Sequence, residues 1–346
     1  MKRIVLLFLA LSALTASAEN ASWLRYPSIS PDGNNVAFSY KGDIYIVDSE
    51  GGEARQLTSN PAYDYSPVWS PDGKTLAFAS DRYGNFDIFT IPVTGGVPFR
   101  VTTHSAKETP WTFTPDGKRL LFTARIQDPA ESAQFPKGTM TELYSVSVNG
   151  GRYEQVLATP AEEVSFIDKN GSFVYQDCKG GENIWRKHHT SSITRDIWMY
   201  DGTRHTKLTS FEGEDRSPRV SADGNTVYFM SERDGSFNIY SFPLNNPDNV
   251  SRVTSHKTHP VRFLTVSDND VLCYGYDGDI YVKRGESASK KLKITVRSDK
   301  NDDNLAELSV SGGGDNDLSA DGKQIAFISW GEVFVASTEY NTVKKI

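Results

Sequence analysis

The sequence predicts an all-β fold: a six-bladed β-propeller of four-stranded blades, followed by one extra blade. Three observations predict it. A turn of the form Ser-Pro-Asp-Gly recurs along the chain, an apolar strand follows each turn, and a further strand that opens with a polar residue follows in register. The composition agrees, because 12% aromatic residues with 27 Gly and 16 Pro favour short strands and turns over long helices.

The recurring turns mark the hairpin between the first and second strands of each blade. Asp accepts hydrogen bonds from its own turn, and Gly adopts the positive φ that a tight reversal needs. The strands that follow, such as Leu76-Ala77-Phe78, are almost wholly apolar, so we expect them to be covered on both faces. The turns contain Asp32-Gly33, Asp72-Gly73, Asp116-Gly117, Asp223-Gly224 and Asp321-Gly322.

The number of third strands and their spacing predict the domains. Third strands begin at Asp43, Asp87, Glu142, Asp196, Asn238, Asp279 and Glu332. Four strands in each unit of roughly 40 to 50 residues are typical of propeller blades, which cover one another's apolar faces. The interval before the last turn is longer than the others and contains a polar run, which indicates a linker. We therefore expect a six-bladed propeller over 22–297, a linker over 298–304, and the first blade of a truncated second propeller over 305–346. A single seven-bladed propeller is the alternative.

The first eighteen residues have the features of a secretory signal peptide. Lys2 and Arg3 precede an apolar run over residues 4–14, and Ala16-Ser17-Ala18 fits a cleavage site. The apolar run is too short to cross a bilayer as a helix. We therefore expect export to the periplasm, with residues 1–18 as the signal peptide and no membrane anchor.

The net charge limits the classes of partner, and the positions of the two cysteines predict their redox state. Without Lys2 and Arg3 the net charge falls from −7 to −9, which repels nucleic acid and anionic lipid, so we exclude both as partners. A whole blade separates Cys178 from Cys273, which is farther than a disulfide can reach, so we expect two free thiols.

Motifs for catalysis and for cofactors are missing from the sequence. It has no G-x-S-x-G, no H-E-x-x-H, no phosphate-binding loop and no dinucleotide-binding glycine pattern. The run from Asp299 does not fit a calcium loop, because Asn304 and Val310 replace the required Gly and Glu. His256 and His259 have no cysteine or carboxylate spaced around them for a metal. We expect no cofactor, no metal site and no catalytic residue.

Two long connections between second and third strands form the candidate binding site. They cover residues 125–141 in blade three and 178–195 in blade four, and both emerge on the same face of the propeller. Their basic residues stand out on an acidic chain, which favours a docking patch for a carboxylate, such as a peptide C-terminus or an acidic partner surface. The alternative is a loop that packs through its Trp and exposes its charges. The candidate residues are Arg125, Lys137, Trp185, Arg186, Lys187, His188, His189 and Arg195.

Three segments resemble the amino-terminal part of bacterial tricorn-like serine peptidases. They are residues 23–27 (Trp-Leu-Arg-Tyr-Pro), residues 80–88 (Ser-Asp-Arg-Tyr-Gly-Asn-Phe-Asp-Ile) and residues 186–192. The resemblance runs from Trp23 to the end of the chain. The blade motif alone is shared with TolB-like propellers, whereas residues 185–192 are more specific.

The resemblance implies a six-bladed propeller followed by a seven-bladed one and by PDZ and catalytic domains. It also implies that the intact proteins cleave peptides, which the propellers filter or channel. The peptidase and PDZ domains are missing from this sequence, so no catalytic residue of the family can be assigned. The peptide-anchoring basic residues of the family cannot be matched to Arg186 or Lys187.

We therefore expect a non-catalytic periplasmic propeller that binds or channels oligopeptides through its loop face and axial channel, for a catalytic domain absent from this chain. The first alternative is a self-sufficient TolB-like propeller that binds a protein partner. The second is a propeller hydrolase.

Overall fold

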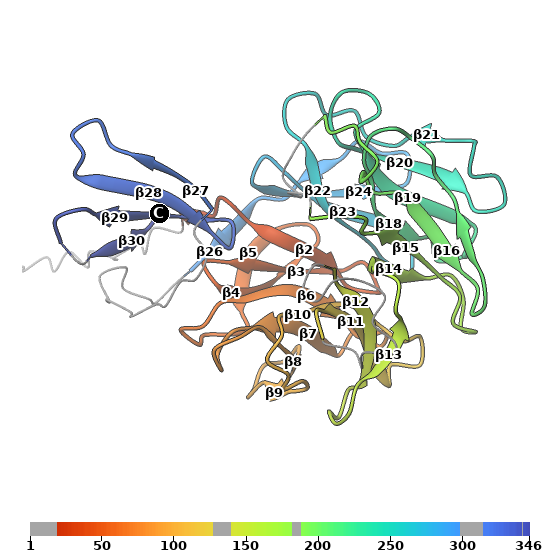
Figure 1. Cartoon of the computed structure of the whole chain (residues 1–346), viewed down its shortest axis with the longest axis horizontal. Helices are drawn as coiled ribbons and strands as arrows, with labels where there is room; N and C mark the ends of the chain where they lie inside the picture. The colour runs from red at the N-terminus through yellow and green to blue at the C-terminus, as the bar shows by residue number, and fades with distance from the viewer. Residues whose placement is uncertain (1–18, 127–139, 182–187, 298–313, 341) are drawn as a thin grey trace, which may run out of the picture. The chain divides into compact units, whose positions relative to one another are not determined.

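The computed structural model describes residues 19–126, 140–181, 188–297, 314–340 and 342–346 (Figure 1). Within these ranges the regular secondary structure consists of thirty β-strands, which confirms the predicted all-β class. The chain divides into two units, Met1–Arg297 and Ser298–Ile346. The predicted signal peptide and linker lie outside the described residues.

Five sheets of the first unit are four-stranded meanders in which each strand pairs antiparallel with the next. The second sheet consists of β6 (Asp64–Trp69), β7 (Thr75–Ser80), β8 (Asp87–Pro92) and β9 (Phe99–Arg100). The third consists of β10 (Glu108–Phe113), β11 (Arg119–Ala124), β12 (Glu142–Ser147) and β13 (Glu154–Leu157). The fourth consists of β14 (Ala161–Phe166), β15 (Phe173–Asp177), β16 (Ile197–Tyr200) and β17 (His205–Lys207). The fifth consists of β18 (Asp215–Val220), β19 (Thr226–Ser231), β20 (Asn238–Pro243) and β21 (Ser251–Arg252). The sixth consists of β22 (Val261–Val266), β23 (Val271–Tyr276), β24 (Asp279–Arg284) and β25 (Lys290–Lys291).

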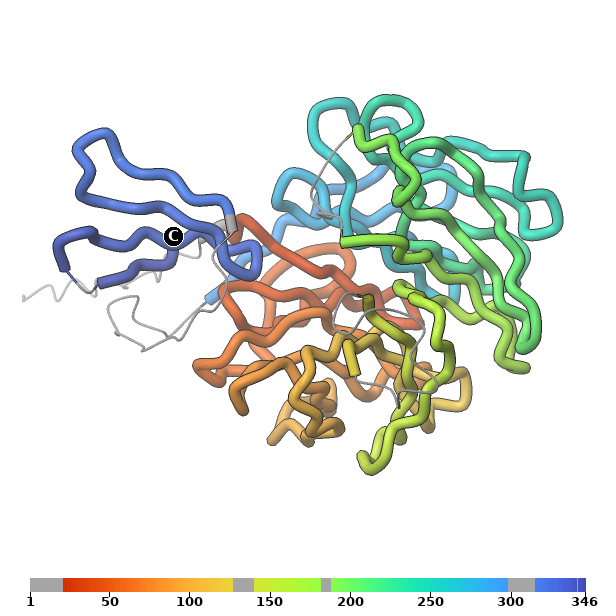
Figure 2. The backbone as a smooth tube through the Cα atoms, in the orientation of Figure 1, coloured from red at the N-terminus to blue at the C-terminus, as the bar shows by residue number. Residues whose placement is uncertain are grey.

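The first sheet has two strands more than the sequence predicted. It contains β2 (Arg25–Ile29), β3 (Asn35–Tyr40), β4 (Asp43–Asp48) and β5 (Gly52–Gln56), and then β26 (Ile294–Val296) and β1 (Glu19–Asn20). Strand β26 follows the sixth blade and pairs parallel with the outer edge of β5, while β1 pairs antiparallel with β26. The two ends of the propeller therefore meet in one sheet, as Figure 2 shows for the red and light-blue segments.

The six sheets form a closed ring. The first strand of each sheet contacts the first strand of the next, and β22 of the last sheet contacts β2 of the first. The first strands therefore surround the axis, and the fourth strands lie at the periphery (Figure 1). This arrangement confirms the six-bladed propeller and excludes the seven-bladed alternative.

The apolar core lies between neighbouring sheets. In one cluster, Ala37 and Ile44 of the first blade pack against Leu76 and Phe78 of the second, and all four side chains are fully buried. Packing of this kind explains why the central residues of the second strands are apolar, since each strand is covered on both faces. No blade buries its faces alone, so the ring is stable only as a unit.

The Asp-Gly turns have the structural role that the sequence predicted. In the first turn the Ser30 hydroxyl donates to an Asp32 carboxylate oxygen at 2.5 Å, and the Gly33 amide donates to the Ser30 carbonyl at 2.9 Å. Gly33 has φ +73°. The Ser30 hydrogen bond lowers the pKa of Asp32, and the equivalent hydroxyl lowers the pKa of the turn aspartates 72, 116, 223 and 321. These carboxylates are occupied in holding their turns.

The second unit contains one more four-stranded meander. Its strands are β27 (Gly314–Leu318), β28 (Gln324–Ser329), β29 (Glu332–Ser337) and β30 (Val343–Lys345). Several of its large apolar side chains are exposed, including Ile328 at 40% and Val333 at 42%. The sheet has the strand order of a propeller blade, and its assignment to a second propeller stays a prediction.

Two further expectations concern the cysteines, which were predicted to be free thiols, and the membrane, for which no anchor was predicted. Cys178 and Cys273 are both free, as the blade assignment predicted. In the part of the chain that the structure describes, no helix has the length and apolar character needed to span a membrane.

Candidate functional site

A cavity of about 530 Å³ lies on the axis of the propeller, enclosed by the first strands of all six blades; we call it the axial channel. Its walls include residues 26–28 of β2, 65–68 of β6, 109–111 of β10, 162 and 163 of β14, 216, 217 and 219 of β18, and 262–265 of β22. Lys107, Arg125 and Thr141 also line it. Because Arg125 and Thr141 flank the blade-three insertion, the channel reaches the face from which that insertion emerges. Its volume falls in the range of small-molecule and cofactor sites.

A β-bulge in the first strand of every blade shapes the channel wall. The pairing register between first and second strands shifts once in each of the six blades. In five blades a non-glycine residue within the bulge adopts a left-handed backbone conformation, with φ between 50° and 58°. These residues are Tyr26, Ser66, Glu163, Ser217 and Phe263. Bulges redirect side chains and are common beside functional sites, and these five residues all line the channel.

Cations outnumber carboxylates on the channel wall. Lys107, Arg125, Arg216, Arg219 and Arg262 line it, against Glu162 and Glu163. Burial, reinforced by the charge of Arg216, lowers the pKa of Arg262 to about 10. Lys107 is exposed as a residue, yet the protein around its ammonium group removes enough water to lower its pKa, and Arg125 adds repulsion. The channel is therefore a local region of positive charge in an acidic protein.

A buried ion-pair network supports the cationic wall from behind. Glu214 is fully buried and accepts a hydrogen bond from Arg216 Nε at 2.8 Å. The carboxylate of Glu214 also accepts the Arg195 backbone N–H at 3.1 Å and lies 3.8 Å from the Arg195 guanidinium. Burial alone would raise the pKa of Glu214, but Arg216 and Arg195 together hold it below its usual value. The network fixes Arg216 at the channel wall.

A salt bridge joins the wall of the fourth blade to the fifth blade, and a hydroxyl contact joins it to the third. Arg219 pairs with the Glu163 carboxylate and donates to the Glu163 carbonyl at 3.3 Å. Glu162 accepts from the Thr141 hydroxyl at 3.0 Å and from the Gln176 amide at 3.2 Å. Both channel carboxylates thus have partners within the protein.

Aromatic rings cover the other side of the channel. The ring of Tyr26 lies 4.7 Å from that of Phe263 and 5.3 Å from that of Tyr65, measured between centroids. The Lys107 ammonium lies 5.4 Å from the Tyr65 ring and 5.2 Å from the Phe86 ring, within the range of cation–π attraction. The sixth, first and second blades therefore present an apolar, aromatic surface to the axis.

The structure places the binding residues that the sequence predicted in different environments. Arg125 lines the channel, and His188 is exposed, with its backbone N–H donating to the Glu232 carboxylate at 2.6 Å. His189 and Arg195 are buried, with 8% and 3% of their surface exposed. The His189 ring lies 2.7 Å from the Ser191 hydroxyl, between Nε2 and Oγ. His189 and Arg195 therefore support the loop and the channel wall, and are not offered to a partner at the surface in this conformation.

Four predicted residues, Lys137, Trp185, Arg186 and Lys187, lie outside the described residues. Their binding role stays a prediction.

The residues that line the channel on the first strands were not predicted from the sequence. Arg216, Arg219 and Arg262 and the aromatic pair Tyr26 and Phe263 are the main ones. The repeat itself marks the positions of the bulge residues that line the channel. Tyr26, Ser66 and Ser217 each stand six residues before the aspartate of an Asp-Gly turn, and Phe263 stands six residues before Asn269 of the corresponding turn in the sixth blade.

The described residues contain no cluster of three or more His, Cys, Asp or Glu side chains that could hold a metal ion.

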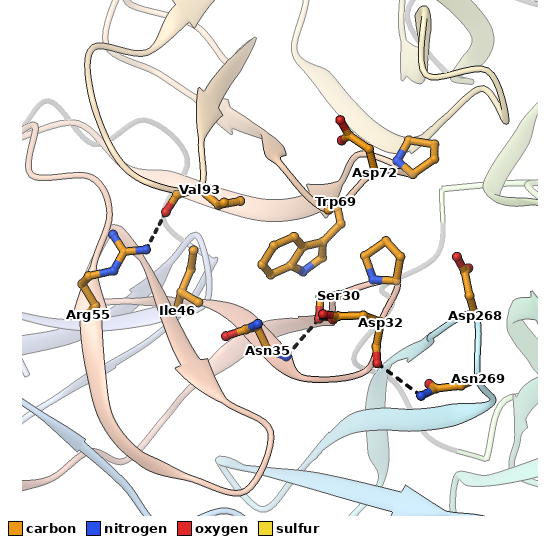
Figure 3. Close-up of a pocket in the computed structure, with 13 residues that line it drawn as sticks. Ser30, Asp32, Asn35, Ile46, Arg55, Trp69, Asp72, Val93, Asp268 and Asn269 are labelled. Carbon is orange, nitrogen blue, oxygen red and sulfur yellow. Dashed lines mark hydrogen bonds between the residues drawn. The ribbon is translucent and has the colours of Figure 1, made fainter.

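A second cavity, of about 460 Å³, lies among the turns of the first, second and sixth blades (Figure 3). Bonds between blades frame it. Arg55 donates to the Val93 carbonyl, Asn269 donates to the Asp32 carbonyl at 3.2 Å, and Trp69 Nε1 donates to the Ser28 carbonyl at 2.8 Å. These contacts hold neighbouring blades together.

Comparisons with known sequences identify relatives of this architecture. Residues 21–290 match the family described as the tricorn protease N-terminal beta propeller domain. The chain is 28% identical over 203 residues to a tricorn protease homolog of Saccharolobus solfataricus, a match that covers 56% of this chain and 18% of the relative. It is 45% identical over 49 residues to a TolB homolog of Chlorobium chlorochromatii, which covers 14% of this chain and 11% of the relative.

Solved structures show the same fold. The tricorn protease crystal structure superposes with a TM-score of 0.67 at 23% identity, covering 94% of this chain and 31% of that one. TolB from Acinetobacter baumannii gives a TM-score of 0.55 at 18% identity, covering 76% of this chain and 61% of that one. The chain thus spans only a part of the relatives it matches. The resemblance seen in the sequence is confirmed: this chain belongs to the family of tricorn protease N-terminal β-propeller domains.

Proposed function

We propose that this chain is a non-catalytic propeller that binds oligopeptides in its axial channel and admits them to a peptidase centre outside the propeller. The observation that carries the proposal is the channel itself, to which all six blades contribute charged, polar and aromatic side chains. The family match supports it, because the matched domain is named as part of a protease.

The chemistry of the channel suits an extended peptide. A peptide backbone needs both donors and acceptors along its length, and the wall supplies guanidinium groups, carboxylates and the hydroxyl of Thr109. The aromatic rings of Tyr26 and Phe263 offer an apolar surface to side chains. The basic residues of the two insertions, Lys137, Arg186 and Lys187 among them, extend this binding surface in the proposal.

Export to the periplasm is part of the same proposal. It is supported by the charged, apolar and small-residue segments of residues 1–18. Expression of the full sequence in a bacterial host followed by cell fractionation tests it. Release of the mature chain with the periplasmic fraction is expected, and retention of the uncleaved chain in the cytoplasm would contradict it.

A channel-filling variant tests peptide binding. Thr109 lines the channel, so Thr109→Trp places a large side chain in the cavity. Thr94→Trp is the matched control, since Thr94 is exposed in the hairpin between β8 and β9 at the periphery. We expect a fluorescein-labelled oligopeptide mixture to bind the unmodified chain and Thr94→Trp with equal anisotropy changes, and Thr109→Trp to lose binding. Circular dichroism confirms that each variant is folded. Equal binding by a folded Thr109→Trp would contradict the proposal.

A second candidate is binding of a folded protein partner, as in a self-sufficient TolB-like propeller. The short match of 45% identity to a TolB homolog favours it. A folded partner cannot enter a cavity of about 530 Å³, so its binding would survive Thr109→Trp. The same variant therefore distinguishes the two functions.

A further inference from the structure

The cations of the axial channel lie in two groups on different blades. Arg262 and Arg216 belong to the sixth and fifth blades and both line the channel, and the charge of Arg216 adds to burial in lowering the pKa of Arg262. Lys107 and Arg125 stand just before β10 and just after β11 of the third blade, and the charge of Arg125 adds to burial in lowering the pKa of Lys107. Like charges brought together in a partly desolvated cavity are stabilised by an anion that binds between or beside them.

The carboxylates already present in the channel are held by the protein. Glu163 pairs with Arg219, and Glu162 accepts hydrogen bonds from Thr141 and Gln176. Glu214 lies behind the wall, fully buried, where Arg216 and Arg195 bind it. Glu232, whose charge acts on Arg262, is buried and accepts the His188 backbone N–H. An anionic ligand therefore adds charge balance without displacing a carboxylate of the protein.

An unbroken row of aromatic rings connects the two cationic groups. Arg262 and Phe263 are neighbours on β22 and both line the channel, and the Arg262 guanidinium lies 5.4 Å from the Phe237 ring. The Phe263 ring lies 4.7 Å from that of Tyr26. The Tyr26 ring lies 5.3 Å from that of Tyr65, and the Lys107 ammonium lies 5.4 Å from the Tyr65 ring. The channel wall thus reads cation, three aromatic rings, cation. A ligand that matches it carries an aromatic group between two anions.

We propose that the axial channel selects oligopeptides in which acidic side chains stand on both sides of an aromatic residue. Arg262 and Lys107 bind the two carboxylates, and the row of Tyr26, Phe263 and Tyr65 contacts the aromatic side chain. This inference rests on the proposed function and names the class of peptide that the channel takes.

Three labelled pentapeptides test the selectivity. Each has glycine at both ends, an amidated C-terminus and the same N-terminal fluorophore, and the central residues are Glu-Phe-Glu, Gln-Phe-Gln or Glu-Ala-Glu. Fluorescence anisotropy with the full chain gives the affinities. We expect the Glu-Phe-Glu peptide to bind at least about tenfold more tightly than either other peptide, as loss of a charge-assisted hydrogen bond or an aromatic contact predicts. The advantage over Gln-Phe-Gln shrinks at high salt, because ions screen the charges.

Charge-removing variants assign the binding to named residues. Arg262→Gln and Lys107→Gln should each weaken the Glu-Phe-Glu peptide about tenfold and leave the Gln-Phe-Gln peptide nearly unchanged. Arg252→Gln is the matched control, because Arg252 pairs with Asp234 at the exposed outer strand β21. Lys107 is solvent-exposed, so Lys107→Gln keeps the test valid if Arg262→Gln does not fold.

The outcomes separate the inference from the proposed function. Binding of no peptide contradicts the proposed function itself. Equal affinities for all three peptides leave peptide binding intact and overturn the selectivity. An equal loss in Arg252→Gln and in the channel variants shows attraction to overall charge, which also overturns it.

Discussion

Closure of the ring by strand β26 leads to a prediction for two glycines at equivalent positions in neighbouring blades. Gly51 and Gly95 lie in the hairpins between the third and fourth strands of the first and second blades, and both have φ +97°. A Cβ added at Gly51 would lie 2.8 Å from the carbonyl oxygen of Lys293, the residue before β26. A Cβ added at Gly95 would meet nothing within 4 Å. The two alanine variants therefore differ only in their effect on ring closure.

The size of the difference follows from what Lys293 and β26 contribute. The backbone strain of alanine at this φ costs about 1 to 3 kcal/mol at either site. At Gly51 the closing segment must also move, which weakens the 2.8 Å hydrogen bond from the Gly52 amide to the Lys293 carbonyl, about 1 kcal/mol. It also exposes part of Ile294, now 3% exposed, whose full burial contributes about 1.5 to 3 kcal/mol. Gly51→Ala should thus lose about 1 to 3 kcal/mol more than Gly95→Ala.

Urea denaturation of the two variants and the unmodified chain measures this difference in the free energy of unfolding. The far-ultraviolet circular dichroism of the folded variants should be unchanged. Equal losses at the two glycines would show that β26 does not close the ring, and would refute the reasoning.

Three further predictions follow. Burial raises the pKa of Glu108 from 4.5 to about 8, so the folded state loses stability as pH rises through that window. Glu108→Gln should become more stable than the unmodified chain by up to about 5 kcal/mol at alkaline pH and differ little at acid pH; parallel denaturation curves would contradict this. A chain ending at Arg297 should keep the thermal transition of the propeller nearly unchanged, because the units divide there, and loss of that transition in calorimetry would contradict the independent stability of the first unit. Trp69→Phe removes the bond to the Ser28 carbonyl between two blades and should cost about 1 kcal/mol in urea, whereas no change would mean that the bond is not formed in solution.

The sequence was sufficient to predict the blades because their signals are local. The Ser30-to-Gly33 turn uses hydrogen bonds between near neighbours, so its residue types identify it without knowledge of the fold. The second strands are equally direct, because burial on both faces makes their central residues apolar, as in Leu76-Ala77-Phe78. Strand β26 was missed because its partner, β5, lies more than two hundred residues away and only three residues pair.

The channel could be predicted only in part. Arg125 was found because it begins a long insertion, but Arg262 and Arg216 sit within ordinary strands, and only the bulge turns their neighbours toward the axis. Arg195 was expected to bind a partner, yet it is buried against Glu214, a residue nineteen positions away. Sequence alone does not show which carboxylate faces a given arginine.

The site of peptide cross-linking tests the central claim most directly. A Glu-Phe-Glu peptide in which a photoreactive benzophenone replaces the phenyl ring would be irradiated with the full chain and its adducts mapped by mass spectrometry. Met230 lines the axial channel, whereas Met199 lies on β16, a third strand. The account predicts adducts on Met230 and on the first strands. Adducts confined to Met199, to other outer strands or to residues 298–346 would contradict it.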